Sequence, residues 1–317
     1  MPDDGRIGRS PNAMDSSSED ETSPLAAVLS ARLHEPGAFA RAASKRTVPT
    51  SLFNEHGKLM IIAADHPARG ALRAGNRVLA MGDRLDLLDR LRVALARPGV
   101  NGVLGTPDII EDLLLLGLLE GKVVFGSMNR GGLAGTVFEL DDRFTAYDAA
   151  TIAAMRFTGG KMLTRIDAGD PATVATVAAC AKAVNELAQR RLIAMIEPFI
   201  SRRVDGRVVN ELTADAMIRA STIAAGLGST SAYTWLKVPV VEDMERVMAA
   251  TTLPALILGG EAGDDVDAAY ESWRRALRLP TVQGLVIGRR LLYPPDDDVA
   301  GAVDIAVSLL QKDPSLV

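Results

Sequence analysis

One lysine of this sequence lies among apolar residues in a segment with the composition of a β-strand. Lys237 is the fifth residue of the run YTWLKVPVV. Burying a charged ammonium without partners is costly, and desolvation or a nearby cation lowers the pKa of a lysine and leaves an uncharged amine. Such an amine can attack a carbonyl carbon and form a Schiff base. A structural lysine in a buried ion pair fits the local pattern equally well.

Other charged residues stand in or directly after further strand-like runs. Lys161 and Arg165 lie in GGKMLTRID, Glu197 closes LIAMIE, and Asp65 follows LMIIAA. A second ammonium would help to keep Lys237 neutral, and a carboxylate beside a lysine can carry protons to and from substrate oxygens. Lys161 stands at the start of its expected strand. Its side chain therefore either reaches up through the interior of the fold or is exposed at the lower rim. For the two acids, Glu197 and Asp65, a purely structural ion pair is the alternative.

Glycines follow the last two strand-like runs. Gly259 and Gly260 come after ALIL, and Gly288 with Arg289 comes after LVI. Glycine lets a ligand approach the backbone closely, and an arginine can bind a phosphate through two hydrogen bonds. These four residues are therefore candidates for a phosphate site, and Arg165 is a further candidate for substrate binding. Glycines that serve only tight turns are the alternative.

The elements that must position these residues alternate along the chain. Strand-like runs are expected at Leu59–Ala64, Gly102–Leu104, Val123–Phe125, Met162–Ile166, Leu192–Ile196, Tyr233–Val238, Ala255–Leu258 and Leu285–Ile287, with helical segments between most of them. Several runs are almost wholly apolar, as expected of parallel strands covered on both faces. This order predicts an α/β protein with a (β/α)8 TIM barrel, whose active site lies at the C-terminal ends of the strands. An open doubly wound sheet is the alternative, but no G-x-G-x-x-G fingerprint follows the first run.

The composition limits the classes of partner. The 317 residues include 35 Lys and Arg against 40 Asp and Glu, a net charge of −5, so nothing in the overall charge attracts nucleic acid or an anionic membrane. One cysteine, Cys180, and three histidines, His34, His56 and His66, are too few for a disulfide framework or a typical zinc site. We therefore expect no metal and no cofactor.

The chain divides into three expected regions. Residues 1–23 are polar and acidic and are predicted to be a disordered tail. Residues 24–57 are predicted to form a helical extension, and residues 58–317 the catalytic barrel. The start of the chain does not have the pattern of a signal peptide, and no apolar run approaches the ~20 residues of a membrane span. These features favour a cytoplasmic protein.

The segments that hold the charged residues resemble a known family. AADHPARGAL resembles the AxDQRGAL-type segment of the class I tagatose-1,6-bisphosphate aldolases, and KMLTRID is similar to their K-x-L-x-x-x-D run. Glu197 and LKVPVV match in order and type, and GLVIGRRLLYP looks like the phosphate-binding end of class I aldolase barrels. The resemblance covers about Lys58 to Pro294. The chain departs from it at His66, where the family has glutamine, and at the two residues inserted before Arg69.

This resemblance implies an activity on a phosphorylated sugar as substrate, assembly into a homo-oligomer, and roles for individual residues. Lys237 would be the Schiff-base lysine of an aldolase, Glu197 and Lys161 the proton-transfer pair, and Asp65 would bind a substrate hydroxyl or orient the lysine. The region from Ser201 to Val241 is also similar to barrel proteins associated with myo-inositol catabolism. That similarity implies cleavage of 6-phospho-5-dehydro-2-deoxy-D-gluconate into dihydroxyacetone phosphate and malonate semialdehyde. The cations considered for the substrate carboxylate are Arg69, Arg165, Arg202 and Arg203.

Three other functions stay open from the sequence. One is a tagatose- or fructose-bisphosphate aldolase. The second is a metal-dependent barrel lyase or isomerase with a carboxylate-bound magnesium ion, which loss of activity in EDTA would indicate. The third is a sugar-phosphate-binding protein without catalysis, which tight binding without turnover would indicate.

Overall fold

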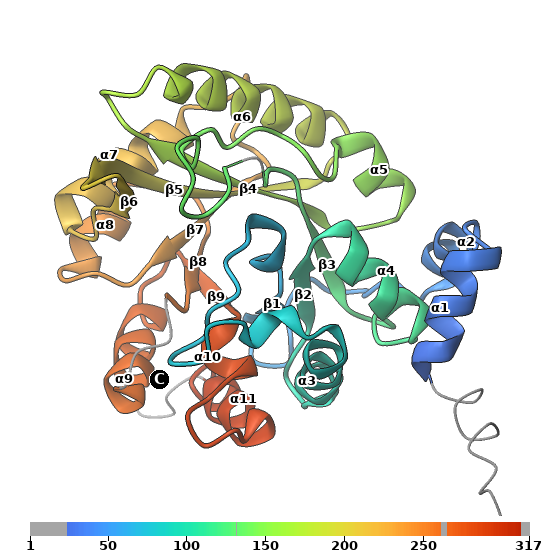
Figure 1. Ribbon diagram of the computed structural model, residues 1–317. Coiled ribbons are helices and arrows are strands. Elements are labelled where there is room, and N and C mark those ends of the chain that lie inside the picture. The colour runs from blue at the N-terminus through green and yellow to red at the C-terminus, as the bar shows by residue number, and fades with distance from the viewer. Residues whose placement is uncertain (1–23, 131, 261–264, 312–317) are drawn as a thin grey trace, which may run out of the picture.

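The computed structural model describes residues 24–130, 132–260 and 265–311, so the predicted tail lies outside the described residues. Within that part of the chain, eight parallel strands form a closed ring (Figure 1). Strand β1 pairs with β2 on one side and with β9 on the other, and β4 pairs with β5 to close the ring. The predicted (β/α)8 TIM barrel is confirmed. Its strands are β1 (Leu59–Ala63), β2 (Gly102–Gly105), β3 (Val123–Ser127), β4 (Gly159–Ile166), β5 (Ile193–Val204), β7 (Thr234–Pro239), β8 (Ala255–Leu258) and β9 (Val282–Ile287).

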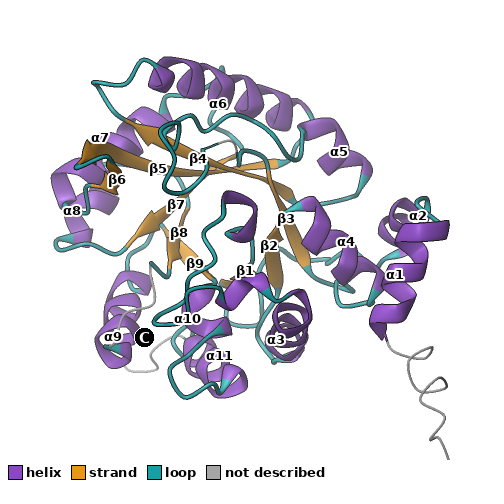
Figure 2. Cartoon of the chain, in the orientation of Figure 1, coloured by secondary structure: helices purple, strands orange, loops and turns teal. Residues whose placement is uncertain are grey.

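Helices surround this ring (Figure 2). They are α3 (Arg84–Ala96), α4 (Pro107–Leu115), α5 (Ala149–Ala154), α6 (Ala172–Gln189), α7 (Ala214–Ala225), α8 (Met244–Ala249), α9 (Val266–Leu277), α10 (Arg289–Leu292) and α11 (Val299–Ser308). Two further helices, α1 (Pro24–His34) and α2 (Ala38–Lys45), pack on α4, where Arg32 forms an ion pair with Asp112 at 2.6 Å. No helix in the described residues combines the length and the apolar character needed to cross a bilayer.

The twofold alternation of the strands separates two apolar layers. Outward residues such as Ile62, Met162 and Leu236 pack against the helices. Inward residues such as Ile61, Phe125 and Leu256 fill the lower part of the barrel. Because side chains alternate between the two faces of a strand, a polar residue two positions beyond an inward apolar residue also faces the interior. The inward face of the strands is therefore apolar in the lower part of the barrel and polar at its upper end.

One hairpin was not expected from the sequence. Strand β5 continues to Val204 and pairs antiparallel with β6 (Arg207–Asn210). Asp205 and Gly206 join the two strands with positive φ angles of 50° and 78°, and an Asp-Gly pair favours the tight turns of two-residue hairpins. The turn signal is thus present in the sequence. The two strands were not predicted because the hairpin extends beyond the barrel and its residues are largely polar and exposed, without the apolar run that marks a covered strand.

Candidate active site

Four residues predicted for catalysis meet inside the upper end of the barrel. Lys237 Nζ lies 2.7 Å from Glu197 Oε1, and Lys161 Nζ forms an ion pair with the other carboxylate oxygen of Glu197. Lys161 also donates a hydrogen bond to Asp65 Oδ2 at 3.2 Å. Three of the side chains come from β4, β5 and β7, and the fourth, Asp65, lies two residues beyond the end of β1. They form one buried set, in which two lysines share a single carboxylate.

Lys161 reaches this set from inside its strand. We expected the strand to begin at Met162, but β4 begins at Gly159, because its glycines pair with Phe125 and Gly126 on one side and with Ile193 and Ala194 on the other. Glycine has a low strand propensity, so local composition did not indicate this early start. Lys161 is only 1% exposed. The lower-rim alternative is therefore wrong, and the side chain rises through the interior to Asp65 and Glu197.

The electrostatics of the set favour an uncharged amine. Burial lowers the pKa of Lys237, and Arg130 and Arg289 lower it further, while Glu197 acts in the opposite direction. Burial and Arg130 also hold the pKa of Lys161 well below its ordinary value. Burial alone would raise the pKa of Glu197, but the two lysines hold it well below its usual range. Glu197 is thus a carboxylate over the physiological range, and the lysines compete for one negative charge.

Asp65 has a second cation that the sequence analysis did not assign. Arg130, three residues beyond the end of β3, forms an ion pair with Asp65 Oδ2. Its Nε donates to Ser127 Oγ at 2.9 Å, and that hydroxyl donates to Asp65 Oδ2 at 3.3 Å. Ser127 is the last residue of the buried strand β3 and Arg130 lies close to its end, which was the available signal. A strand-end position alone did not show which acid Arg130 would meet.

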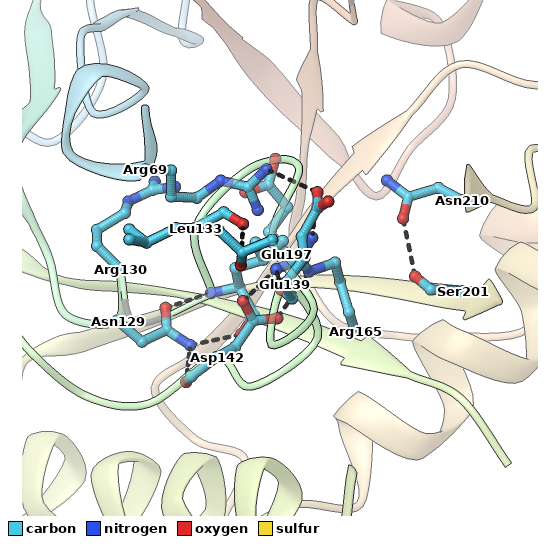
Figure 3. A network of polar contacts seen from close by, with 12 residues as sticks. Arg69, Asn129, Arg130, Leu133, Glu139, Asp142, Arg165, Glu197, Ser201 and Asn210 are labelled. Carbon is cyan, nitrogen blue, oxygen red and sulfur yellow. Dashed lines mark hydrogen bonds and ion pairs between the residues drawn. The ribbon is translucent and has the colours of Figure 1, made fainter. Parts of the chain in front are cut away.

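A further polar network lies beside this set (Figure 3). Arg165 binds both oxygens of Asp142, at 2.9 and 2.6 Å, and contacts Glu139 Oε1 at 3.3 Å. Glu139 also lies 4.0 Å from Arg69. Arg165 therefore sits where it was expected, at the end of β4, but its guanidinium is already engaged by two acids. Glu139 and Asp142 come from the long connection between β3 and α5 and were missed, because nothing local marks this connection as part of the site.

All predicted site residues line one cavity of about 340 Å³, and so does His66, which the sequence analysis left out of the catalytic set. Gly259, Gly260, Gly288 and Arg289 form part of its wall. In the described part of the chain, six basic residues line it against three acidic ones: Arg69, Arg130, Lys161, Arg165, Lys237 and Arg289 against Asp65, Glu139 and Glu197. This excess of basic residues favours an anionic ligand. Neither Arg202 nor Arg203 lines the cavity: Arg202 pairs with Glu211 at 3.2 Å, and Arg203 lies 3.9 Å from Asp170.

The glycines of the wall serve different geometric needs. A Cβ atom at Gly288 would collide with the carbonyl oxygen of Ala63, so the close approach of β9 to β1 requires glycine there. Gly260 has a φ angle of +67° and open space around it, so it is required by the turn. The turn interpretation thus applies to Gly260, whereas Gly288 allows the wall itself to form.

We expect Gly288→Ala to destabilise the fold by about 1–3 kcal/mol, because the new methyl group must displace backbone. Gly169→Ala is the matched control, since its Cβ would meet Asp167 Oδ1 at an ordinary 3.4 Å and its φ angle is not positive. That change should stay within about 0.5 kcal/mol. Denaturant unfolding of the original protein and of the two variants measures the change in the free energy of unfolding for each. Equal stability of the two variants would contradict the packing argument.

The chain is similar in sequence and fold to known proteins. The family described as Cgl0159-like matches residues 57–307. The crystal structure of Cgl0159 from Corynebacterium glutamicum has 53% sequence identity and a TM-score of 0.88, over 90% of this chain and 96% of that chain. No curated protein matches.

Two aldolase structures share the fold at low identity. An archaeal fructose-1,6-bisphosphate aldolase, solved with its catalytic lysine covalently bound to the carbinolamine intermediate, has 17% identity and a TM-score of 0.61, over 86% of this chain and 99% of that chain. The fructose-bisphosphate aldolase from Slackia heliotrinireducens has 17% identity and a TM-score of 0.56, over 84% and 94%.

Proposed function

We propose that this chain, which belongs to the Cgl0159-like family, is a class I aldolase that cleaves a phosphorylated keto-sugar or keto-sugar acid through a Schiff base on Lys237. The observation that carries the proposal is the pairing of Lys161 and Lys237 on Glu197 in the wall of a cavity rich in cations. Two buried ammonium groups beside one carboxylate are unfavourable, so one lysine is driven towards the neutral amine. A neutral amine at a cavity surface is the nucleophile that imine formation requires.

The geometry supports a definite sequence of steps. The Lys237 amine adds to the ketone carbon, and loss of water from the carbinolamine leaves an iminium ion. Removal of a proton from the hydroxyl on the β-carbon then breaks the bond between the α- and β-carbons. The β-carbon leaves as an aldehyde, and the electron pair of the broken bond passes to the iminium group, which becomes an enamine. Protonation of the enamine carbon and addition of water then release the ketone product and restore the amine. Glu197 lies within hydrogen-bond distance of both lysines, so it can move protons in these steps with Lys161.

The archaeal neighbour supports this chemistry as an analogy. Its catalytic lysine is bound to a carbinolamine, and the likeness to this chain shows the fold alone. We extend that chemistry to Lys237 because Lys237 lies in the cavity wall and contacts an ionised carboxylate. The overall barrel would be compatible with many other reactions.

The cation distribution supports a substrate with a phosphate and a second anionic group. Gly259, Gly260, Gly288 and Arg289 form one part of the wall, and we assign the phosphate to them. Of the four arginines considered for a carboxylate, Arg69 lines the cavity and has its acidic contact, Glu139, only at 4.0 Å. We therefore assign the carboxylate to Arg69 and propose 6-phospho-5-dehydro-2-deoxy-D-gluconate as the finer substrate, which would connect the protein to inositol catabolism.

Borohydride reduction tests the Schiff base directly. Incubation with dihydroxyacetone phosphate and sodium borohydride should add a stable mass to Lys237, located by peptide mass spectrometry, because borohydride reduces an iminium ion to a secondary amine. Borohydride without the ketone is the control and should add nothing. An adduct that forms equally well on Lys237→Ala would show that the assignment is wrong.

A panel of substrates tests the finer assignment. Triose-phosphate release should be fastest from the phosphorylated keto-sugar acid and slower from fructose and tagatose bisphosphates, since only the acid offers a carboxylate to Arg69. Faster cleavage of a sugar bisphosphate would indicate that this bisphosphate, and not the keto-sugar acid, is the substrate. Tight binding of every member without cleavage would favour a binding protein.

A further inference from the structure

The catalytic set belongs to a longer row of buried charges that alternate in sign. Arg130 pairs with Asp65, Asp65 with Lys161, Lys161 with Glu197, and Glu197 with Lys237. Each of these side chains is at most 11% exposed. Charges this far from water interact strongly and are costly unless they balance. The number of charges in the row therefore constrains which of its members can carry a proton.

The row balances only if one lysine is neutral. The Arg130 guanidinium and the Asp65 carboxylate cancel, which leaves Lys161 and Lys237 facing the single negative charge of Glu197. One ammonium neutralises that carboxylate, and a second would leave an uncompensated positive charge in the interior. Without Arg130, two carboxylates would face two lysines, and both lysines would be held as ammonium ions.

We propose, building on the Schiff-base function above, that Arg130 is a positioning residue: it neutralises Asp65, and so releases one lysine of the row to act as an uncharged amine. Burial lowers the pKa of Arg130 to about 10, which still leaves the guanidinium charged at neutral pH. Ser127 fixes its orientation through the 2.9 Å bond to Nε. Arg130 forms its ion pair with Asp65 and acts electrostatically on both lysines, so its effect passes through Asp65 and through its own charge.

Other charged groups also surround Lys237, and Arg289 acts on its pKa in the same direction as Arg130. Within the described residues they are Glu197 from β5, Lys161 from β4, Asp65 and His66 after β1, and Arg289 from α10. Arg69, Glu139 and Arg165 line the same cavity as Lys237. His66 is neutral at physiological pH, because burial and Arg289 hold its pKa well below its ordinary value. Among the described residues at the end of β8, Leu258, Gly259 and Gly260 line the cavity, and these three carry no charge.

The sign of the expected pH effect follows from the charges. A lysine is nucleophilic above its pKa, so its reactivity rises with pH. Removing the positive charge of Arg130 raises the pKa of Lys237 and moves this rise to higher pH. Removing the negative charge of Asp65 has the opposite effect. Removing both charges restores the charge balance of the row. The pH midpoint of Lys237 reactivity then returns towards that of the original protein.

The test measures the reactivity of Lys237 as a function of pH by two methods. The first is trace acetylation with acetic anhydride, quantified by mass spectrometry relative to Lys182, whose side chain is 78% exposed. The second is borohydride trapping with dihydroxyacetone phosphate. Arg130→Gln should raise the midpoint by at least about one pH unit, which is roughly tenfold less reaction below both midpoints. Arg130→Lys, which keeps the charge, should shift it much less.

The double variant makes the test specific. Asp65→Asn should lower the midpoint, and Arg130→Gln combined with Asp65→Asn should bring it back to within about 0.3 pH units of the original. If Arg130→Gln does not fold, Asp65→Asn and the double variant still give this comparison. An unchanged midpoint in Arg130→Gln, or a double variant with no return, would overturn the inference. If acetylation shifts as expected but no keto-phosphate is ever trapped, the charge balance stands and the aldolase proposal fails.

Discussion

Lys237→Arg is expected to lower kcat for triose-phosphate release by at least about a thousandfold. A guanidinium stays charged at every accessible pH and cannot form an imine, although it can still pair with Glu197. Ion pairing is thus kept while nucleophilicity is lost. This separates the two interpretations of Lys237 that its local sequence leaves open, because a purely structural lysine would be replaced by arginine at much smaller cost.

The control for this change is Lys182→Arg on α6. The Lys182 side chain is 78% exposed, and its Nζ lies 3.8 Å from Glu186 Oε1. Its kcat should stay within about twofold of the original, since surface changes are usually small. A coupled assay of triose phosphate measures both variants, and borohydride trapping should give no adduct at position 237 of the first. Turnover of Lys237→Arg within tenfold of the original would exclude the Schiff-base mechanism.

Glu197→Gln should lower kcat by about 10²–10⁴-fold, the usual contribution of a positioned acid–base group. Gln keeps the size of the side chain but cannot take up and return a proton. The same change removes the negative charge that opposes the lowered pKa of Lys237, so the amine becomes more readily neutral. Trapping of dihydroxyacetone phosphate should therefore fall much less than C–C cleavage, and its pH midpoint should move down.

Glu139→Gln provides the matched control inside the same cavity. Glu139 contacts Arg165 at 3.3 Å and Arg69 at 4.0 Å, so its loss should affect KM through these arginines. We expect its decrease in kcat to be at least about tenfold smaller than that of Glu197→Gln. Single-turnover cleavage and trapping yield separate the two steps. An equal loss in both variants would mean that charge in the cavity, rather than proton transfer at Glu197, controls the rate.

The sequence alone determined the barrel and the inward positions of its main polar residues. Strand-like and helical runs alternate regularly, and the apolar runs place parallel strands in a covered sheet. Because side chains alternate with period two, Asp65, Glu197 and Lys237 follow inward apolar residues and must reach the same interior. The resemblance to aldolases added the roles that we propose for these residues.

The tertiary structure decided which charges meet. Asp65 and Arg130 belong to different strand ends, and neither spacing nor composition shows that their side chains touch. Glu139 enters the site on a long loop, and Lys161 reaches Glu197 because β4 starts earlier than its glycines suggested. Local sequence specifies the direction of each side chain through backbone geometry. Ion pairing between distant segments depends on strand register, loop path and burial, and these arise only when the whole barrel has closed.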